Sequence, residues 1–156
     1  MIAHPIPPVF NERSRILILG SFPSQKSRET AFFYGHPQNR FWCVIASVCG
    51  RDVPQTIDEK RAMLLEEKIA LWDVIASCDI EGSADSSIRN AVPNDLDVIF
   101  CTAKIEKIVV NGKTAQKYYS KYQEKKHGPA ICLPSTSPAN AAWSLERLTD
   151  AWRVIR

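Results

Sequence analysis

Polar residues follow four short apolar runs, and together their side chains could bind a small polar ligand. These residues are Gly20-Ser21, Asp73, Asn111 and the segment from Ser135 to Ser137. Their hydroxyl, carboxylate and amide groups donate or accept hydrogen bonds. In open α/β sheets, ligands bind outside the carboxyl ends of the strands. If the four runs are parallel strands, one pocket would collect all four groups.

The stretch after the first apolar run adds aromatic rings and an amide to this set. Four branched aliphatic residues, 16–19, are typical of a strand that is buried on both faces of a parallel sheet. Gly20 then permits a sharp turn and the close approach of the backbone to a ligand. Tyr34 and Asn39 come next, and the apolar spacing that starts at Phe41 predicts that Asn39 stands at a helix amino terminus.

Apolar runs and helical patterns alternate along the chain. Strands are expected at 15–19, 69–74, 107–110 and 130–133, and helices at 41–49, 56–67, 113–125 and after Ser137, which would cap a helix that has Pro138 at its first position. Residues 94–103 fit a short strand or one helix face, and we favour the helix. This order predicts an α/β fold, a three-layer α/β/α sandwich around a central four-stranded, mainly parallel sheet.

Two further stretches lack a clear periodic pattern. Residues 1–14 carry three prolines and should form an extended lead-in over the surface of a single domain, 1–156. Residues 73–87 are rich in Ser, Asp and Gly and are expected to form a long loop. Long loops beside strand ends are often functional, so this one belongs among the candidate parts of the site.

Composition limits the classes of protein that this chain can represent. Its 156 residues are 45% hydrophobic and 24% charged, and the net charge of +3 is compatible with a polyanionic partner. No apolar run approaches the ~20 residues of a membrane span, and no signal-peptide pattern opens the chain, so a cytoplasmic protein without membrane contact is expected. Five widely spaced cysteines are interpreted as reduced core residues. Three scattered histidines predict no metal site, and no cofactor is expected.

Three ordered motifs resemble those of the uracil-DNA glycosylase superfamily. The segment from Gly20 to Ser24 resembles its first motif, which is the loop after the first strand. The segment from His36 to Trp42 resembles the part that follows in the mismatch-specific uracil and thymine glycosylases. The segment from Leu133 to Ser137 resembles the second motif. The resemblance implies a monomeric enzyme that excises deaminated bases from DNA without strand cleavage.

Within the superfamily, the hypoxanthine-DNA glycosylase branch is the most similar. The first motif of the mismatch-specific enzymes carries an asparagine and that of the uracil-specific enzymes an aspartate, whereas this chain has Ser21 or Phe22 there. The resemblance implies that Asn39 takes the catalytic role and positions the attacking water. An amide has no useful pKa and cannot act as a strong base, so a largely dissociative path is expected.

The resemblance also implies roles for the other residues of the motifs. Tyr34 would stack on a base that is flipped out of the DNA. The base-binding residues would be Gly20, Ser21, Phe22, Pro23, Tyr34, Asp73 and Asn111, and the DNA-binding residues would be Ser24, Lys113, Pro134, Ser135, Thr136 and Ser137.

The residues leave several alternatives open. Asn39 could serve only as a helix cap, Tyr34 only as a core residue, Asp73 only in a salt bridge, and Asn111 only in a turn. His36 could donate to the leaving base or be purely structural. For the whole protein, the alternatives are a uracil or thymine mismatch glycosylase, a non-catalytic module that binds damaged bases, and a hydrolase of small nucleotides.

Overall fold

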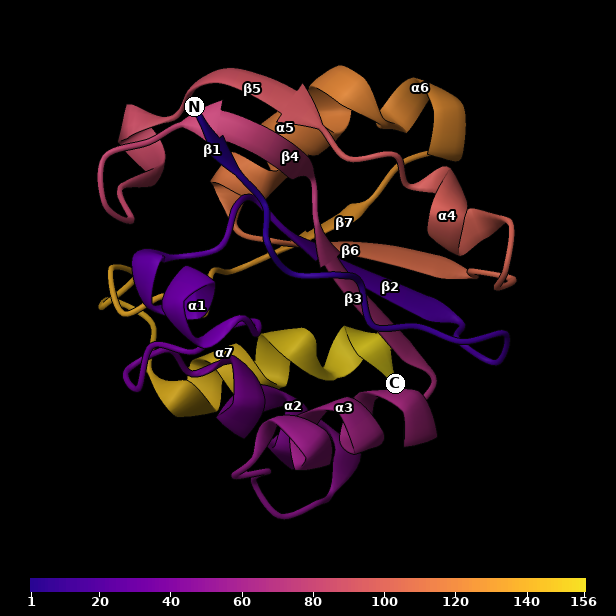
Figure 1. The fold of residues 1–156 in the computed structure, drawn as a ribbon. Helices are drawn as coiled ribbons and strands as arrows, with labels where there is room; N and C mark the ends of the chain where they lie inside the picture. Colours follow the sequence, from indigo (N-terminus) through magenta and orange to yellow (C-terminus); the bar gives the residue numbers. More distant parts are fainter.

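A computed structural model describes all residues, 1–156, and it is organised around one parallel sheet (Figure 1). The strands of this sheet are β2 (Ile16–Gly20), β3 (Ile69–Asp73), β6 (Lys107–Asn111) and β7 (Ile131–Leu133), in the order β3-β2-β6-β7. All neighbours run parallel, and Leu19 lies in register with Trp72 on one side and Val110 on the other. The predicted four-stranded parallel sheet is therefore confirmed, and its carboxyl ends meet at one edge.

Helices cover both faces of the sheet (Figure 1). One face packs against α2 (Phe41–Cys49), α3 (Ile57–Glu66) and α7 (Leu145–Trp152), and the other against α4 (Asp97–Phe100) and α5 (Lys113–Tyr122), which is followed by the short α6 (Glu124–His127). Successive residues of a strand point to opposite faces, so Ile18 joins the first core while Leu17 and Leu19 join the second. The three-layer α/β/α prediction is confirmed.

A second, antiparallel sheet was not predicted. It consists of β1 (Ile2–Ala3), β4 (Ile75–Asp79) and β5 (Arg89–Pro93), in the order β1-β4-β5. The expectation of a loop over 73–87 is wrong for β4, and η1 (Asp85–Ser87) adds a short 3-10 turn. These strands are short and mixed in polarity, and they form because segments far apart in the sequence pair with one another.

The lead-in is extended as expected, but it does not only wrap the surface. Ile2 pairs with Cys78, and Val9 bridges to Leu71 of β3. Ile6 and Val9 are buried in the core. This part of the chain therefore runs antiparallel alongside β3 and β4, and it carries His4 to Asp73 at the carboxyl end of β3.

Several expected boundaries need correction. Ser137 caps no helix, because residues 135–144 form a loop and α7 begins only after Ser144, whose hydroxyl accepts the Arg147 N–H. The helix expected at 113–125 breaks at Gln123 between α5 and α6. Two short elements, α1 (Gln25–Thr30) and η2 (Arg153–Ile155), were not predicted. In contrast, Thr56 caps α3 as its sequence indicates.

All five cysteines are free thiols, but the core interpretation holds only in part. Cys78 is buried, Cys43 and Cys49 are half-buried, and Cys101 and Cys132 are exposed. The apolar residues next to Cys101 and Cys132 lie at the ends of α4 and β7, where one side of the chain faces solvent. None of the helices combines the length and the hydropathy needed to span a bilayer.

Candidate active site

A cavity of about 570 Å³ opens at the carboxyl ends of the parallel strands. This volume lies in the range of small-molecule sites. The cavity brings together most of the residues that the motifs singled out: Gly20, Ser21, Phe22, Pro23, Ser24, Tyr34, Asn39, Asp73, Asn111, Ser135, Thr136 and Ser137. Lys113 and Pro134 do not line it. The sequence did not predict the contribution of Ser27, and it indicated Asp85 only as part of the segment 73–87.

Asn39 lies immediately before α2, and its side chain is held at two points. Its Oδ1 accepts the N–H of Phe41, the first residue of α2, at 2.9 Å, which forms an Asx turn before the helix, whose N-cap is Arg40. The same Oδ1 accepts a second hydrogen bond from Thr136 Oγ1 at 2.9 Å. Asn39 is therefore not the N-cap of α2, and its amide is part of the cavity wall.

Thr136 joins Asn39 to Asn111 at the end of β6. Asn111 Nδ2 donates to Thr136 Oγ1 at 3.1 Å, and the backbone N–H of Thr136 donates to Asn111 Oδ1 at 3.1 Å. Thr136 is fully buried, so its hydroxyl serves these two amides and is not presented to solvent. Asn111 thus contributes more than the turn that Asn-Gly sequences favour.

Tyr34 forms the inner wall of the cavity. Its backbone is in the left-handed region, with φ at 52°, and its ring stacks on Phe41 at 4.1 Å between centroids. The hydroxyl is buried without a hydrogen-bond partner. Burial, and after it the nearby Asp73 carboxylate, raises the pKa of Tyr34 well above its usual value. A neutral phenol that lacks a partner is a donor available to a ligand.

Gly20 is needed where β2 enters the site. A Cβ at this position would lie 2.3 Å from Asp73 Oδ1 and 2.8 Å from the Tyr34 hydroxyl. Both distances are shorter than non-bonded contacts permit. The glycine therefore allows a carboxylate and a phenol to reach the same point at the floor of the cavity.

Asp73 ends β3 and pairs with His4, a contact that sequence reasoning missed. His4 Nε2 lies 2.7 Å from Asp73 Oδ2, and the two side chains are 3% and 5% exposed. His4 Nδ1 accepts the Ile6 N–H at 3.2 Å, so Nε2 carries the proton and donates to the carboxylate. The ring also packs edge-on against Phe22. A lone histidine in a proline-rich segment gave no signal of this role.

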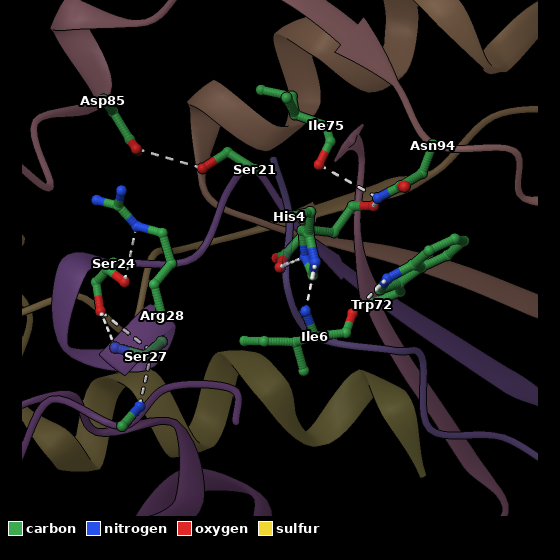
Figure 2. Close-up of polar contacts among 12 residues, drawn as sticks. His4, Ile6, Ser21, Ser24, Ser27, Arg28, Trp72, Ile75, Asp85 and Asn94 are labelled. Carbon is green, nitrogen blue, oxygen red and sulfur yellow. Dashed lines mark hydrogen bonds and ion pairs between the residues drawn. The ribbon is translucent and has the colours of Figure 1, made fainter. Parts of the chain in front are cut away.

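The first-motif loop is supported by a second carboxylate (Figure 2). Ser21 Oγ donates to Asp85 Oδ1 at 3.3 Å. Although the residue as a whole is exposed, burial of its carboxyl group raises the pKa of Asp85, and Asp73 adds to the effect. Helix α1 holds the loop that carries Asp85, because Arg28 donates to the Gly82 carbonyl at 2.6 Å. Ser24 is used as the cap of α1.

The loop between β7 and α7 is braced by Arg40, the neighbour of Asn39. The guanidinium donates to the carbonyls of Ser137 at 3.2 Å and Asn140 at 3.1 Å, and also to that of Trp143. These bonds explain why the segment remains a loop and does not extend α7. Ser135 and Ser137 consequently stay at the cavity.

His36 also lines the cavity, although its ring has a local structural role. Its Nδ1 accepts the Gln38 N–H at 3.1 Å within the turn before α2. No lysine lines the cavity. The structure also contains no group of three or more His, Cys, Asp or Glu side chains that could hold a metal ion. The chemistry of the site is therefore that of amides, hydroxyls, carboxylates and aromatic rings.

A parallel α/β sheet carries a polar cavity with aromatic rings at its strand ends, which is the arrangement of a small-ligand binding site. Residues 7–156 match the family model of the Uracil DNA glycosylase superfamily, and the chain belongs to this superfamily.

Relatives cover nearly the whole chain. It is 33% identical over 157 residues to a hypoxanthine DNA glycosylase of Methanosarcina acetivorans, with 99% of this chain and 98% of the relative covered. It is 34% identical to a hypoxanthine DNA glycosylase of Methanosarcina barkeri, with 94% and 92% covered. A solution NMR structure of a candidate uracil DNA glycosylase from M. acetivorans superposes with a TM-score of 0.82, at 31% identity and 99% coverage of both chains.

Proposed function

We propose that this protein is a monofunctional DNA glycosylase, active as a monomer, that excises hypoxanthine in preference to other deaminated bases. Its membership of the superfamily and the names of its two archaeal relatives support this function. The observation that carries the proposal is the meeting of Tyr34, Asn39, Asp73 and Asn111 in one cavity at the strand ends. A planar base needs an aromatic ring to stack on, and hydrogen-bond donors and acceptors along its edge.

The base would enter this cavity by flipping out of the DNA stack, which costs a few kcal/mol and least for a poorly paired base. Phe41 covers one face of the Tyr34 ring, and the other face would stack on the base. Hypoxanthine presents a ring N–H and a carbonyl oxygen. The Asp73 carboxylate accepts hydrogen bonds, and the free Tyr34 hydroxyl and the Asn111 amide supply further polar contacts.

In the chemical step, the bond between C1′ and the base nitrogen breaks, and its electron pair leaves with the base. A water oxygen then bonds to C1′, and the proton that the water loses is balanced by the proton that the released base gains. Asn39 would position this water and has no ionisable group with which to deprotonate it. Because no lysine lines the cavity, the nucleophile would be water and no Schiff base would form.

The DNA backbone would lie across the mouth of the cavity. Ser135 and Ser137 line the cavity in the loop that Arg40 braces, and Ser24 lies on the opposite loop. Lys113, the first residue of α5, lies outside the cavity, where a cation can contact a phosphate. Thr136 is buried and would support this surface from within.

The proposal is tested by single-turnover cleavage of end-labelled duplexes that carry one hypoxanthine, xanthine or uracil, followed by alkali. We expect hypoxanthine to be released fastest. Asn39→Ala should lose about 10²-fold in rate, as expected when a positioned group is removed, while still binding the duplex. Fastest release of uracil would contradict the preference, and an Asn39→Ala rate equal to wild type would contradict the assignment of Asn39.

One observation favours a second candidate, a non-catalytic module that binds damaged bases. Ser21 or Phe22 stands at the first-motif position where the mismatch-specific and uracil-specific enzymes carry an amide or an acid, and the Phe22 ring is buried against His4. The first motif therefore supplies neither a carboxylate nor a side-chain amide of its own. Tight binding of hypoxanthine-containing DNA without release of any deaminated base would favour this function over the first.

A further inference from the structure

We infer that Thr136 is a positioning residue that orients the side-chain amide of Asn39, so that Asn39 presents a hydrogen-bond donor, Nδ2, to the cavity. This inference rests on the proposed function, because it concerns how Asn39 would act on the water or the base. It differs from the role that the sequence motif implies for Thr136, which is contact with DNA.

The direction of each hydrogen bond in this network follows from groups that can only donate. The backbone N–H of Thr136 donates to Asn111 at 3.1 Å, so the atom that receives it must be the oxygen, Oδ1. The other side-chain atom of Asn111 is then Nδ2, which donates to Thr136 Oγ1 at 3.1 Å. The Thr136 hydroxyl accepts there, and its single proton is free to be given to Asn39.

Asn39 receives that proton and is constrained from a second side. Thr136 Oγ1 and the backbone N–H of Phe41 both lie 2.9 Å from Asn39 Oδ1. An amide oxygen has two lone pairs, and both are occupied. If the amide were flipped, its NH₂ group would face the Phe41 N–H, which can only donate. The nitrogen must therefore be the atom that remains for a ligand in the cavity.

Burial shows that the Thr136 hydroxyl acts inside the protein. Thr136 is fully buried, whereas Asn39 and Asn111 are partly exposed and line the cavity. The three residues come from the turn before α2, the end of β6 and the loop after β7. The Thr136 hydroxyl thus connects three segments that are distant in sequence, and both side-chain amides that it contacts line the cavity.

The orientation has a chemical consequence. Nδ2 can hold the oxygen of a water or a developing negative charge on the base, but it cannot accept a proton from the water. A water held in this way keeps a lone pair for C1′ and loses its proton only after the new bond has formed. This agrees with a path in which the bond to the base breaks before water adds.

Matched variants test the role of Thr136. Thr136→Val keeps the shape and removes the hydroxyl, whereas Thr136→Ser keeps the hydroxyl. With a hypoxanthine duplex and saturating enzyme, Thr136→Val should lose about 10²-fold in single-turnover rate with its Kd for DNA within about 3-fold of wild type. Thr136→Ser should stay within about 3-fold in rate. A weaker Kd at an unchanged rate would instead make Thr136 a DNA contact and overturn the inference.

Asn39→Asp tests the donor directly. The carboxylate has the same shape, but the oxygen that replaces Nδ2 can only accept hydrogen bonds. We expect Asn39→Asp to lose as much rate as Asn39→Ala. A rate equal to or above wild type would show that the site needs an acceptor and would contradict the inference. This comparison does not depend on how well Thr136→Val folds.

A spectroscopic readout separates this inference from the proposed function. In ¹H–¹⁵N spectra, the side-chain amide signals of Asn39 and Asn111 are assigned by their loss in Asn39→Ala and Asn111→Ala. Both signals should move in Thr136→Val and stay in place in Thr136→Ser. If wild type releases no base while these signals move as expected, the proposed function fails and the network stands. Signals that do not move in Thr136→Val would overturn the network itself.

Discussion

Removal of the His4 side chain is expected to destabilise the fold and to disturb the floor of the cavity. His4 Nε2 donates to Asp73 Oδ2 at 2.7 Å, and neither side chain has appreciable contact with solvent. His4→Ala leaves the carboxylate buried without this donor. Leaving a buried acceptor without its donor costs about 1–3 kcal/mol, and more when the acceptor is charged. The free energy of unfolding of a native domain is about 5–15 kcal/mol, so this loss is a large share of the total stability.

The free energy of unfolding is measured by urea titration with tryptophan fluorescence, and Trp72 lies beside the His4 ring. His4→Gln is the matched control, because its side-chain amide can donate to Asp73 from a similar position. We expect His4→Ala to lose about 3 kcal/mol and His4→Gln to lose less than half of that. A double-mutant cycle with Asp73→Asn isolates the pair.

The coupling energy from this cycle should reach about 1.5–3 kcal/mol, the range for a hydrogen bond to a charged group. A coupling below about 0.5 kcal/mol would refute the reasoning, because contacting residues normally couple by more than that. His4→Ala should also slow base release more than it weakens DNA binding, since Asp73 faces the cavity on its other oxygen. Activity equal to wild type would separate the pair from the site.

Two further predictions concern Gly20 in the cavity and His127 at the end of α6. Gly20→Ala should slow single-turnover base release by about 10²-fold or more, because its Cβ would lie 2.3 Å from Asp73 Oδ1. A rate equal to wild type would show that Asp73 can move aside without loss of activity. Burial lowers the pKa of His127, which stacks on Phe100. As pH falls below the usual value of about 6.5, the unfolded state binds the proton first, so stability should fall with pH. In urea titrations from pH 7.5 to 5.5, this fall should be smaller in His127→Gln, and an identical slope would contradict it.

Much of the central fold could be predicted because it depends on local patterns. The aliphatic residues of β2 and β6 indicated strands buried on both faces, and Thr56 indicated a helix start. Parallel strands place their carboxyl ends at one edge, so the sequence order alone predicted that Asp73 and Asn111 would share a pocket. These features are set by the residues themselves and by elementary sheet geometry.

Other features depended on contacts between distant segments. Strand β4 is short and mixed in polarity, and it is stable as a strand only because β1 and β5 pair with it. The pattern at Ser137 and Pro138 is typical of a helix start, but the Arg40 guanidinium donates hydrogen bonds to the backbone carbonyls of that loop. Long-range hydrogen bonds therefore outweighed the local preference of this segment for a helix.

The sequence by itself determined the parallel sheet, the motifs and the set of polar residues available at the strand ends. Only the tertiary structure decided how these residues are used: His4 with Asp73, Thr136 between Asn39 and Asn111, and Asp85 beside Ser21. The physical reason is that strands and helices arise from periodic patterns that a window of sequence contains. A single hydrogen bond between distant residues leaves no such pattern, and its direction is settled only by the donors that surround it.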